Sequence, residues 1–280
     1  MTLQTLEHTS IDEITDVFNR SFADYLVPFK LTKEQLATKM QVENIHLKYS
    51  AGAFESDKLV GFILHGIHPS PKVAYNAGTG VIPEMRGQRL TQQMYAFILP
   101  LLRQEQFAKI QLEVISENTK AYKSYEAIGF KKVRELTCFK GNIAPSNISN
   151  PFKFKALSNK HWAILDTFWD WQPTWQNAMP AIENNKDNIQ TIGLFAQDEL
   201  WAYAVFNPTS KRIHQFGVHK NHRNQGIGRL LFSAVSKILQ SDCSLINIDS
   251  SSASTISFLT HIGLKIFIKQ YEMELNLDTN

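Results

Sequence analysis

A strand-like run followed by a helical apolar pattern stands out in the last quarter of the chain. Residues 212–218 mix apolar and polar positions, which predicts a strand, and from 230 to 239 the apolar positions recur at helical spacing. A polar turn containing Gly226 and Gly228 joins the two. A strand, a glycine turn and a helix in this order direct free backbone N–H groups and the positive helix end toward an anion.

The same pattern occurs in the first half of the chain. The segment 80–90 matches 217–227 in its glycine, valine, arginine and glutamine positions. Two further pairs match in the same order, namely 52–62 with 193–203, both hairpin-like, and Gly129-Phe130 with Gly263-Leu264. Three ordered matches predict one fold duplicated in tandem.

The repeat and the composition of the intervening segment predict the domain boundaries. We expect a first domain over 1–143, a linker over 144–151 that is rich in Ser, Asn and Pro, and a second domain over 152–280. Capping boxes at Ser10 and Thr32 predict two helix starts early in the chain. Each half reads strand, helices, hairpin, glycine-loop helix, strand, helix, strand. This order predicts an α/β fold with two mixed twisted sheets flanked by helices.

Composition excludes several classes of function. The formal net charge of +3 is too small for a nucleic-acid-binding surface. No apolar run approaches the length of a membrane span, and we expect no signal peptide. The two cysteines, Cys138 and Cys243, lie far apart and predict a reduced, cytoplasmic protein. The histidines lack companion carboxylates at ligand spacing, so we expect no metal.

The order Arg223-x-x-Gly226-x-Gly228 resembles the pyrophosphate loop of the GCN5-related N-acetyltransferase (GNAT) family, which holds acetyl-CoA. The first half also matches the second signature of that family, N-x-x-A-x-x-x-Y-x-x-x-G-F. The matching residues are Asn118, Ala121, Tyr125, Gly129 and Phe130. The resemblance implies that Tyr125 is the general acid that protonates the departing CoA sulfur, and that Asn118 helps to hold the pantetheine arm.

The acceptor amine must also lose a proton. Glu113 lies on the strand predicted over 109–115, which would end at the acyl site, and is the candidate base. Simple structural roles remain open for both catalytic candidates: Tyr125 as a core aromatic residue, and Glu113 as a solvated or paired strand residue.

The two loops differ, because Arg89 and Thr91 replace the two glycines in the first half. A Cβ at residue 89 would narrow the approach of a phosphate, whereas its guanidinium would pair with the pyrophosphate. We expect both loops to bind acetyl-CoA. The residues expected to contact it are Val81, Arg86, Gly87, Gln88, Arg89, Leu90, Thr91 and Asn118 in the first half, and Val218, Arg223, Asn224, Gln225, Gly226, Ile227 and Gly228 in the second.

The second half has Leu259 at the position of Tyr125, and leucine cannot donate a proton. We therefore expect the first half to transfer an acetyl group directly from acetyl-CoA to a primary amine of a small molecule or peptide. Two alternatives remain open: a non-catalytic acyl-CoA-binding protein, and an activity that resides in the second half. The sequence leaves a monomer and a homodimer equally open.

Overall fold

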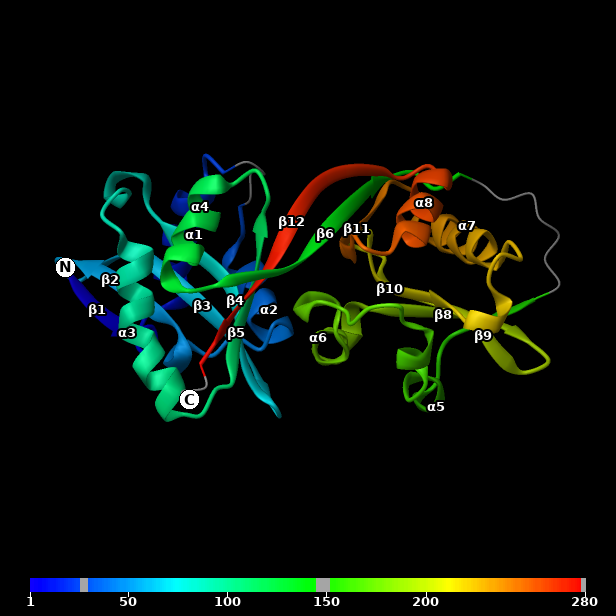
Figure 1. The fold of residues 1–280 in the computed structure, drawn as a ribbon, viewed down its shortest axis with the longest axis horizontal. Coiled ribbons are helices and arrows are strands. Elements are labelled where there is room, and N and C mark those ends of the chain that lie inside the picture. Colours follow the sequence, from blue (N-terminus) through cyan, green and yellow to red (C-terminus); the bar gives the residue numbers. More distant parts are fainter. Residues whose placement is uncertain (26–29, 145–151, 278–280) are drawn as a thin grey trace. The chain divides into compact units, whose positions relative to one another are not determined.

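The computed structural model describes residues 1–25, 30–144 and 152–277. The chain forms two compact units, shown in Figure 1. The first unit comprises Met1–Arg134 and Tyr271–Asn280, and the second comprises Glu135–Gln270. All of the predicted linker except residue 144 lies outside the described residues. The domain boundary placed at this linker therefore stays a prediction.

The first unit is a mixed sheet in the strand order β1-β2-β3-β4-β5-β12. Its β1 to β4 pair antiparallel, and β4 pairs parallel with β5. Its elements are β1 (Thr2–Thr5), α1 (Ile11–Phe22), α2 (Lys33–Val42), β2 (Ala51–Glu55), β3 (Lys58–Pro69), β4 (Lys72–Val81), α3 (Leu90–Gln104), β5 (Lys109–Ile115) and α4 (Thr119–Ile128).

The second unit repeats this plan in the strand order β6-β11-β10-β9-β8-β7. Its β10 pairs antiparallel with β9 and parallel with β11. Its elements are β7 (Lys153–Lys155), α5 (Asn159–Trp162), α6 (Met179–Asn184), β8 (Gln190–Ala196), β9 (Glu199–Asn207), β10 (Arg212–Val218), α7 (Ile227–Leu239), β11 (Cys243–Asp249) and α8 (Ala253–His261).

Two long strands belong partly to each unit. β6 (Lys131–Gly141) begins in the first unit and ends in the second, whereas β12 (Lys265–Asn276) begins in the second and ends in the first. The packing units therefore differ from the sequence halves, because the last strand of each half completes the other sheet. A sequence repeat alone does not show which sheet a terminal strand joins.

The duplication extends to irregularities of the strands. One extra residue, Val60, interrupts the pairing of β3 with β2, and Trp201 does the same in β9. Ala77 is the extra residue of β4 against β3, and His214 is that of β10 against β9. A bulge at matching places in both halves supports the predicted tandem fold.

Helices cover both faces of the first sheet. On β3, Gly61 faces Met94 of α3, whereas the next residue, Phe62, stacks on Phe18 of α1 with ring centroids 5.6 Å apart. Neighbouring strand residues point to opposite faces, so α1 and α3 lie on opposite sides of the sheet.

The first two helices begin at the capping residues that the sequence predicted. The side chains of Ser10 and Thr32 cap α1 and α2, and Thr32 forms the complete capping box with Gln35. Glu13 departs from the predicted box, because its carboxylate accepts a hydrogen bond from the backbone of Leu59. Among the described helices, none is long and apolar enough to span a membrane.

Candidate functional site

The parallel strands β4 and β5 separate toward their carboxyl ends. They pair from Val73↔Lys109 to Tyr75↔Gln111, and β4 then continues to Val81 and β5 to Ile115. We call this stretch the first opening. In the second unit, β10 and β11 pair only at Arg212↔Ser244, which leaves a second opening. Ligands of open α/β sheets bind at the carboxyl ends of diverging parallel strands.

The bulge at Ala77 determines which side chains face each side of the first opening. Because β4 has one residue too many here, Asn76 and Gly78 point to opposite faces instead of the same one. Gly78 faces Phe18 of α1, whereas the amide of Asn76 donates to the hydroxyl of Tyr95 on α3 at 2.8 Å. Residues two apart on β4, which would share a face in a regular strand, therefore reach opposite faces of the sheet.

Asn76 organises a polar cluster on the α3 side. Its Nδ2 lies 2.8 Å from Thr79 Oγ1 and 3.5 Å from the hydroxyl of Tyr125, and its Oδ1 accepts from Gly78 N at 3.0 Å. These contacts tie the bulge of β4 to the side chain of Tyr125 on α4.

Tyr125, the predicted acid, lies half-buried beside the first opening. Its ring makes edge contacts with Tyr95 and Phe130, at centroid distances of 6.4 and 5.6 Å. Burial raises the pKa of its hydroxyl, because the phenolate loses solvation. Tyr125 therefore stays protonated at neutral pH, as a proton donor must.

Glu113, the predicted base, lies on the other face of the first opening. Its Oε2 accepts a hydrogen bond of 2.6 Å from Tyr75, the last paired residue of β4. Burial, with smaller contributions from the charges of Glu272 and Glu43, raises the pKa of Glu113 to about 7. The Tyr75 hydroxyl and, more weakly, Arg134 lower it. A carboxyl with this pKa is partly ionised at neutral pH and able to take up a proton.

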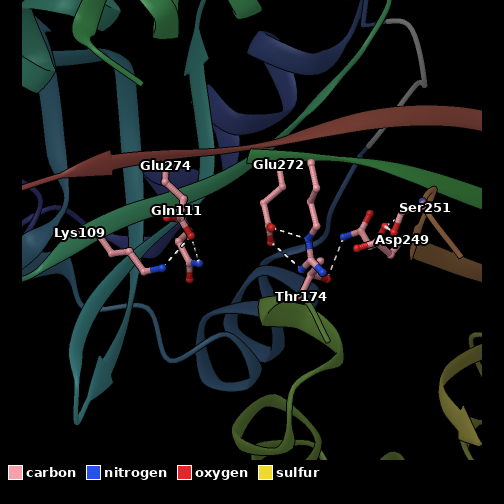
Figure 2. A network of polar contacts seen from close by, with 9 residues as sticks. Lys109, Gln111, Thr174, Asp249, Ser251, Glu272 and Glu274 are labelled. Carbon is pink, nitrogen blue, oxygen red and sulfur yellow. Dashed lines mark hydrogen bonds and ion pairs between the residues drawn. The ribbon is translucent and has the colours of Figure 1, made fainter. Parts of the chain in front are cut away.

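The C-terminal strand β12 shapes the charge around Glu113. Glu274 accepts hydrogen bonds of 2.7 Å from both Lys109 and Gln111 of β5 (Figure 2). Glu272, also in Figure 2, is held by Arg134 through bonds of 2.6 and 3.1 Å. The last strand of the chain thus contributes to the electrostatics of a site in the first unit.

Asn118 is the N-cap of α4. Its Oδ1 accepts from the backbone of Ala121 at 3.1 Å, and its Nδ2 donates to the hydroxyl of Tyr25 at 3.2 Å. The cap fixes the start of the helix that carries Tyr125. The predicted contact of Asn118 with the pantetheine arm stays a prediction.

The two predicted loops share one backbone conformation. Gly87 and Arg89 have positive φ angles of 81° and 58°, and their counterparts Asn224 and Gly226 have 61° and 79°. Each loop therefore holds one glycine and one larger residue in the left-handed region. Replacement of the glycine by Arg89 leaves the course of the first loop unchanged.

The loop arginines have matching structural contacts. Arg86 donates to Val81 O and Ser21 O and forms an ion pair with Asp24 at 2.6 Å. Arg223 donates in the same way to two backbone oxygens, of Val218 and Phe168, and pairs with Asp170 at 2.9 Å.

Each arginine thus ties its loop to the helical segment that precedes the sheet. Its side chain has this fixed role in addition to the predicted contact with a phosphate.

The helices after both loops begin without side-chain caps. α1, α2 and α4 have capping side chains, whereas α3 and α7 begin after Arg89 and Gly226 with no side-chain cap hydrogen bond. Leu90 and Ile227, their first residues, are buried and anchor them. The N–H groups of these first turns remain available to an anion.

The remaining predicted contact residues belong to the two loops and to the first turns of α3 and α7. Gln88 is exposed and its carbonyl accepts from Gln93 at 2.9 Å, whereas Thr91 is half-buried in the first turn of α3. Gln225 is also exposed, and its amide lies 3.4 Å from Asn221 O. Gly228 lies directly beneath the ring of Phe258, where a Cβ would come within 3.0 Å.

The second unit contains a pocket of about 430 Å³ at the second opening. The pocket begins at the loop and the start of α7, where Arg223, Gly226 and Arg229 line it, and reaches Asn247 on β11. Aromatic side chains form much of the remaining wall: Phe168, Trp169, Trp171, Tyr203, Phe216 and Phe258.

The second unit lacks both groups that could move a proton at the first opening. Leu259, at the position of Tyr125, is fully buried in the core. Asn247, in β11, takes the place of Glu113 in β5. Its amide donates to Thr174 at 3.1 Å and its oxygen accepts from Gln270 at 2.6 Å.

Tyr75, Asn76 and Asn247 were not identified from the sequence. The segments 109–115 and 243–249 have equal length, so an alignment of the two places Asn247 opposite Glu113. This match could have identified Asn247 from the sequence. No comparable signal exists for Tyr75 and Asn76, because their directions depend on the bulge at Ala77.

Comparisons with known proteins agree with this geometry. The profile of the acetyltransferase (GNAT) family matches residues 11–130 and again 157–263. A search of the curated proteins found no match.

Several solved structures share the fold over nearly the whole chain. A GCN5-related N-acetyltransferase from Sphaerobacter thermophilus has a TM-score of 0.76 at 12% identity, covering 100% of this chain and 96% of that one. A tandem GNAT protein from the clavulanic acid biosynthesis pathway has a TM-score of 0.73 at 11% identity, with 100% of both chains covered. A putative acetyltransferase from Pyrococcus horikoshii has a TM-score of 0.70 at 10% identity, covering 98% and 89%.

Proposed function

The chain belongs to the acetyltransferase (GNAT) family in a tandem form, and we propose that its first unit transfers an acetyl group from acetyl-CoA to a primary amine. The observation that carries this proposal is the pair of proton-active groups on opposite faces of the first opening. Tyr125 lies on the α4 side, and Glu113 lies on the side of α1.

Each group has the protonation state that its role requires. Glu113, with a pKa of about 7, accepts a proton from the acceptor nitrogen as that nitrogen attacks the acetyl carbonyl. Tyr125, whose pKa is raised, gives its hydroxyl proton to the departing sulfur. The thioester supplies the acetyl group directly, because the sequence shows no acyl-enzyme nucleophile signature.

The residues present suit an anionic cofactor at both loops. The uncapped starts of α3 and α7 offer backbone N–H groups to a pyrophosphate. Arg89 is exposed beside the first of these starts, and Arg229 lines the pocket beside the second. We propose that the predicted loop residues, from Val81 to Thr91 and from Val218 to Gly228, hold acetyl-CoA in this way.

The acceptor is proposed as a small-molecule or peptide amine. It would reach the acetyl group from the α1 and α2 side, where Glu113 lies hydrogen-bonded to Tyr75. Partial burial of Glu113 favours a neutral amine over one that arrives as a cation, since a neutral amine needs less desolvation.

Replacement of Tyr125 by Phe tests the proposal. We expect kcat for acetylation of a panel of primary amines, followed through the release of free CoA, to fall about 10²- to 10⁴-fold. Tyr122→Phe is the matched control, because Tyr122 lies on the same helix and packs on Tyr271. Equal rates for Tyr125→Phe and the wild type would refute the acid assignment, and a wild type that acetylates no amine would favour the non-catalytic alternative.

A further inference from the structure

Four polar side chains meet on the α3 side of the first opening: Asn76 and Thr79 of β4, Tyr95 of α3 and Tyr125 of α4. Asn76 lies at their centre and is buried. Its Nδ2 lies 2.8 Å from both Thr79 Oγ1 and the Tyr95 hydroxyl, and 3.5 Å from the Tyr125 hydroxyl. The side chain of the proposed acid therefore ends in a group of hydrogen-bonding partners and not in an apolar core.

The backbone fixes the orientation of the Asn76 amide. Gly78 N donates to Oδ1 at 3.0 Å, and a backbone N–H must meet an oxygen, so the amide nitrogen faces the tyrosines. An amide nitrogen only donates hydrogen bonds. The oxygen of Tyr125 is therefore the acceptor in its contact with Asn76, and its own proton points away from the amide.

The Thr79 hydroxyl is the second donor at this oxygen. Its proton can rotate between Asn76 Oδ1, at 3.2 Å, and the oxygen of Tyr125. Burial raises the pKa of Tyr125 and the nearby Tyr25 adds to this rise, whereas a hydrogen bond with Thr79 and, more weakly, one with Asn76 lower it. Donors lower the pKa of a phenol because they stabilise the phenolate.

The duplication shows how the same places are filled in the unit without the acid. The bulges at Ala77 and His214 pair the positions on the strands, and the first residues of α3 and α7 pair those on the helices. The four counterparts are all apolar: Ile213, Phe216, Phe232 and Leu259. All four belong to or pack against one apolar core. The fold therefore does not require polar side chains at these places, and the polar set occurs together with Tyr125.

We propose that Asn76 and Thr79 are positioning residues for Tyr125, which direct its proton to the opening and stabilise the phenolate that remains after transfer. The inference rests on the proposed role of Tyr125. As the C–S bond of the thioester breaks, the O–H bond of Tyr125 breaks and an S–H bond forms, so negative charge moves from the sulfur to the phenolate oxygen. Donors already in place at that oxygen stabilise this charge, and water returns the proton before the next turnover.

Titration of Tyr125 by ¹⁹F NMR tests the stabilisation without any need for turnover. The full chain is labelled with fluorotyrosine, because fluorine lowers the pKa of a phenol and brings its titration closer to neutral pH, and Tyr125→Phe assigns the signal. We expect the pKa of Tyr125 to be higher in Thr79→Val than in the wild type by roughly one to two units, as for the loss of a hydrogen bond to a charged group.

Two variants control this titration. Thr79→Ser keeps the hydroxyl and should keep the wild-type pKa of Tyr125. Thr15→Val removes a hydroxyl that donates to Ile11 O within α1 and should also leave this pKa unchanged. Thr79→Ala takes the place of Thr79→Val if the latter does not fold. An unchanged pKa of Tyr125 after loss of the Thr79 hydroxyl would overturn the proposal.

Kinetics separate this inference from the proposed function. Thr79→Val should lower kcat by up to about tenfold, as expected for a weaker acid, and leave KM for acetyl-CoA unchanged, and Thr79→Ser should recover the rate. If Tyr125→Phe is slow but Thr79→Val keeps the wild-type kcat, the inference fails and the proposed function stands. If the wild type acetylates no amine, the proposed function fails, whereas the NMR titration still decides whether Thr79 stabilises the phenolate.

Discussion

Glu113 and Tyr75 form a hydrogen-bonded pair at the point where β4 and β5 separate. The bond of 2.6 Å holds one carboxylate oxygen, and leaves the other for an acceptor amine. Since a hydroxyl that donates to a carboxylate stabilises its charged form, Tyr75 limits the rise in the pKa of Glu113 that burial causes. The proton affinity of the proposed base therefore depends on this pair of residues.

Removal of the Tyr75 hydroxyl should shift the pH dependence of the reaction. In Tyr75→Phe the pKa of Glu113 rises, so the acidic limb of kcat/KM should move to higher pH by roughly one to two units, the equivalent of a hydrogen bond to a charged group. Tyr95→Phe, a change on the other face of the sheet, should lower the rate without moving the limb. An unshifted limb in Tyr75→Phe would exclude a role for Tyr75 in setting the proton affinity.

Glu113 also makes stability depend on pH. Its pKa rises from the ordinary value of 4.5 to about 7 on folding, so the folded chain binds the proton more tightly. The wild type therefore loses stability as the pH rises through this window, on the order of 2 kcal/mol.

Glu113→Gln should not show this loss. The melting temperature of Glu113→Gln minus that of the wild type should increase as the pH rises from about 5 to 8. The exposed substitution Glu117→Gln should give a constant difference, and a constant difference for Glu113→Gln would contradict the assigned burial effect.

At the scale of elements, the two loops show how one backbone course tolerates different sequences. Arg89 adopts the left-handed region, which costs a non-glycine residue roughly 1–2 kcal/mol of backbone strain. Natural proteins keep such strain where the residue has a function. An exposed guanidinium at the uncapped start of α3 is suited to pair with pyrophosphate.

Arg89→Gly separates these two contributions. Relief of backbone strain nearly offsets the greater freedom of glycine in the unfolded chain, so the free energy of unfolding should change by less than about 1 kcal/mol. KM for acetyl-CoA should rise about tenfold, the lower end expected for a charge-assisted bond. Arg89→Lys, which keeps the charge, should recover part of the affinity, and an unchanged KM in both variants would rule out the pyrophosphate contact.

Much of the arrangement of strands and loops could be predicted from the sequence. Hydrophobic periodicity gave the bounds of β5 and β10, and the repeated glycine positions revealed the duplication. The facing of Tyr75 and Asn76 was not readable, because one extra residue, Ala77, reverses the alternation that strand patterns assume. The ion pair of Arg86 with Asp24 was also unforeseen, since it joins residues that only the fold brings together.

At the scale of the molecule, each packing unit needs a strand from the distant part of the chain. The first unit includes Tyr271–Asn280, which place Glu272 and Glu274 beside β5. The repeat predicted two halves but not this exchange, because the closing strands of both halves have similar patterns.

Separation of the halves should therefore abolish folding of each. A fragment of residues 1–143 lacks the end of β12 and exposes the unpaired edge of β5, which favours aggregation. We expect fragments 1–143 and 152–280 to be insoluble alone and to form a soluble complex when co-expressed. A soluble, cooperatively melting fragment 1–143 would contradict the importance of the exchanged strand.

The pH dependence of kcat/KM for acetyl transfer, in the wild type and in Glu113→Gln, tests whether Glu113 is the base. We expect the wild-type rate to rise through an apparent pKa of about 7, and Glu113→Gln to be slow and to lack this rise. A Gln variant that keeps both the rate and the rise would contradict the placement of the base, and with it the assignment of transfer to the first unit.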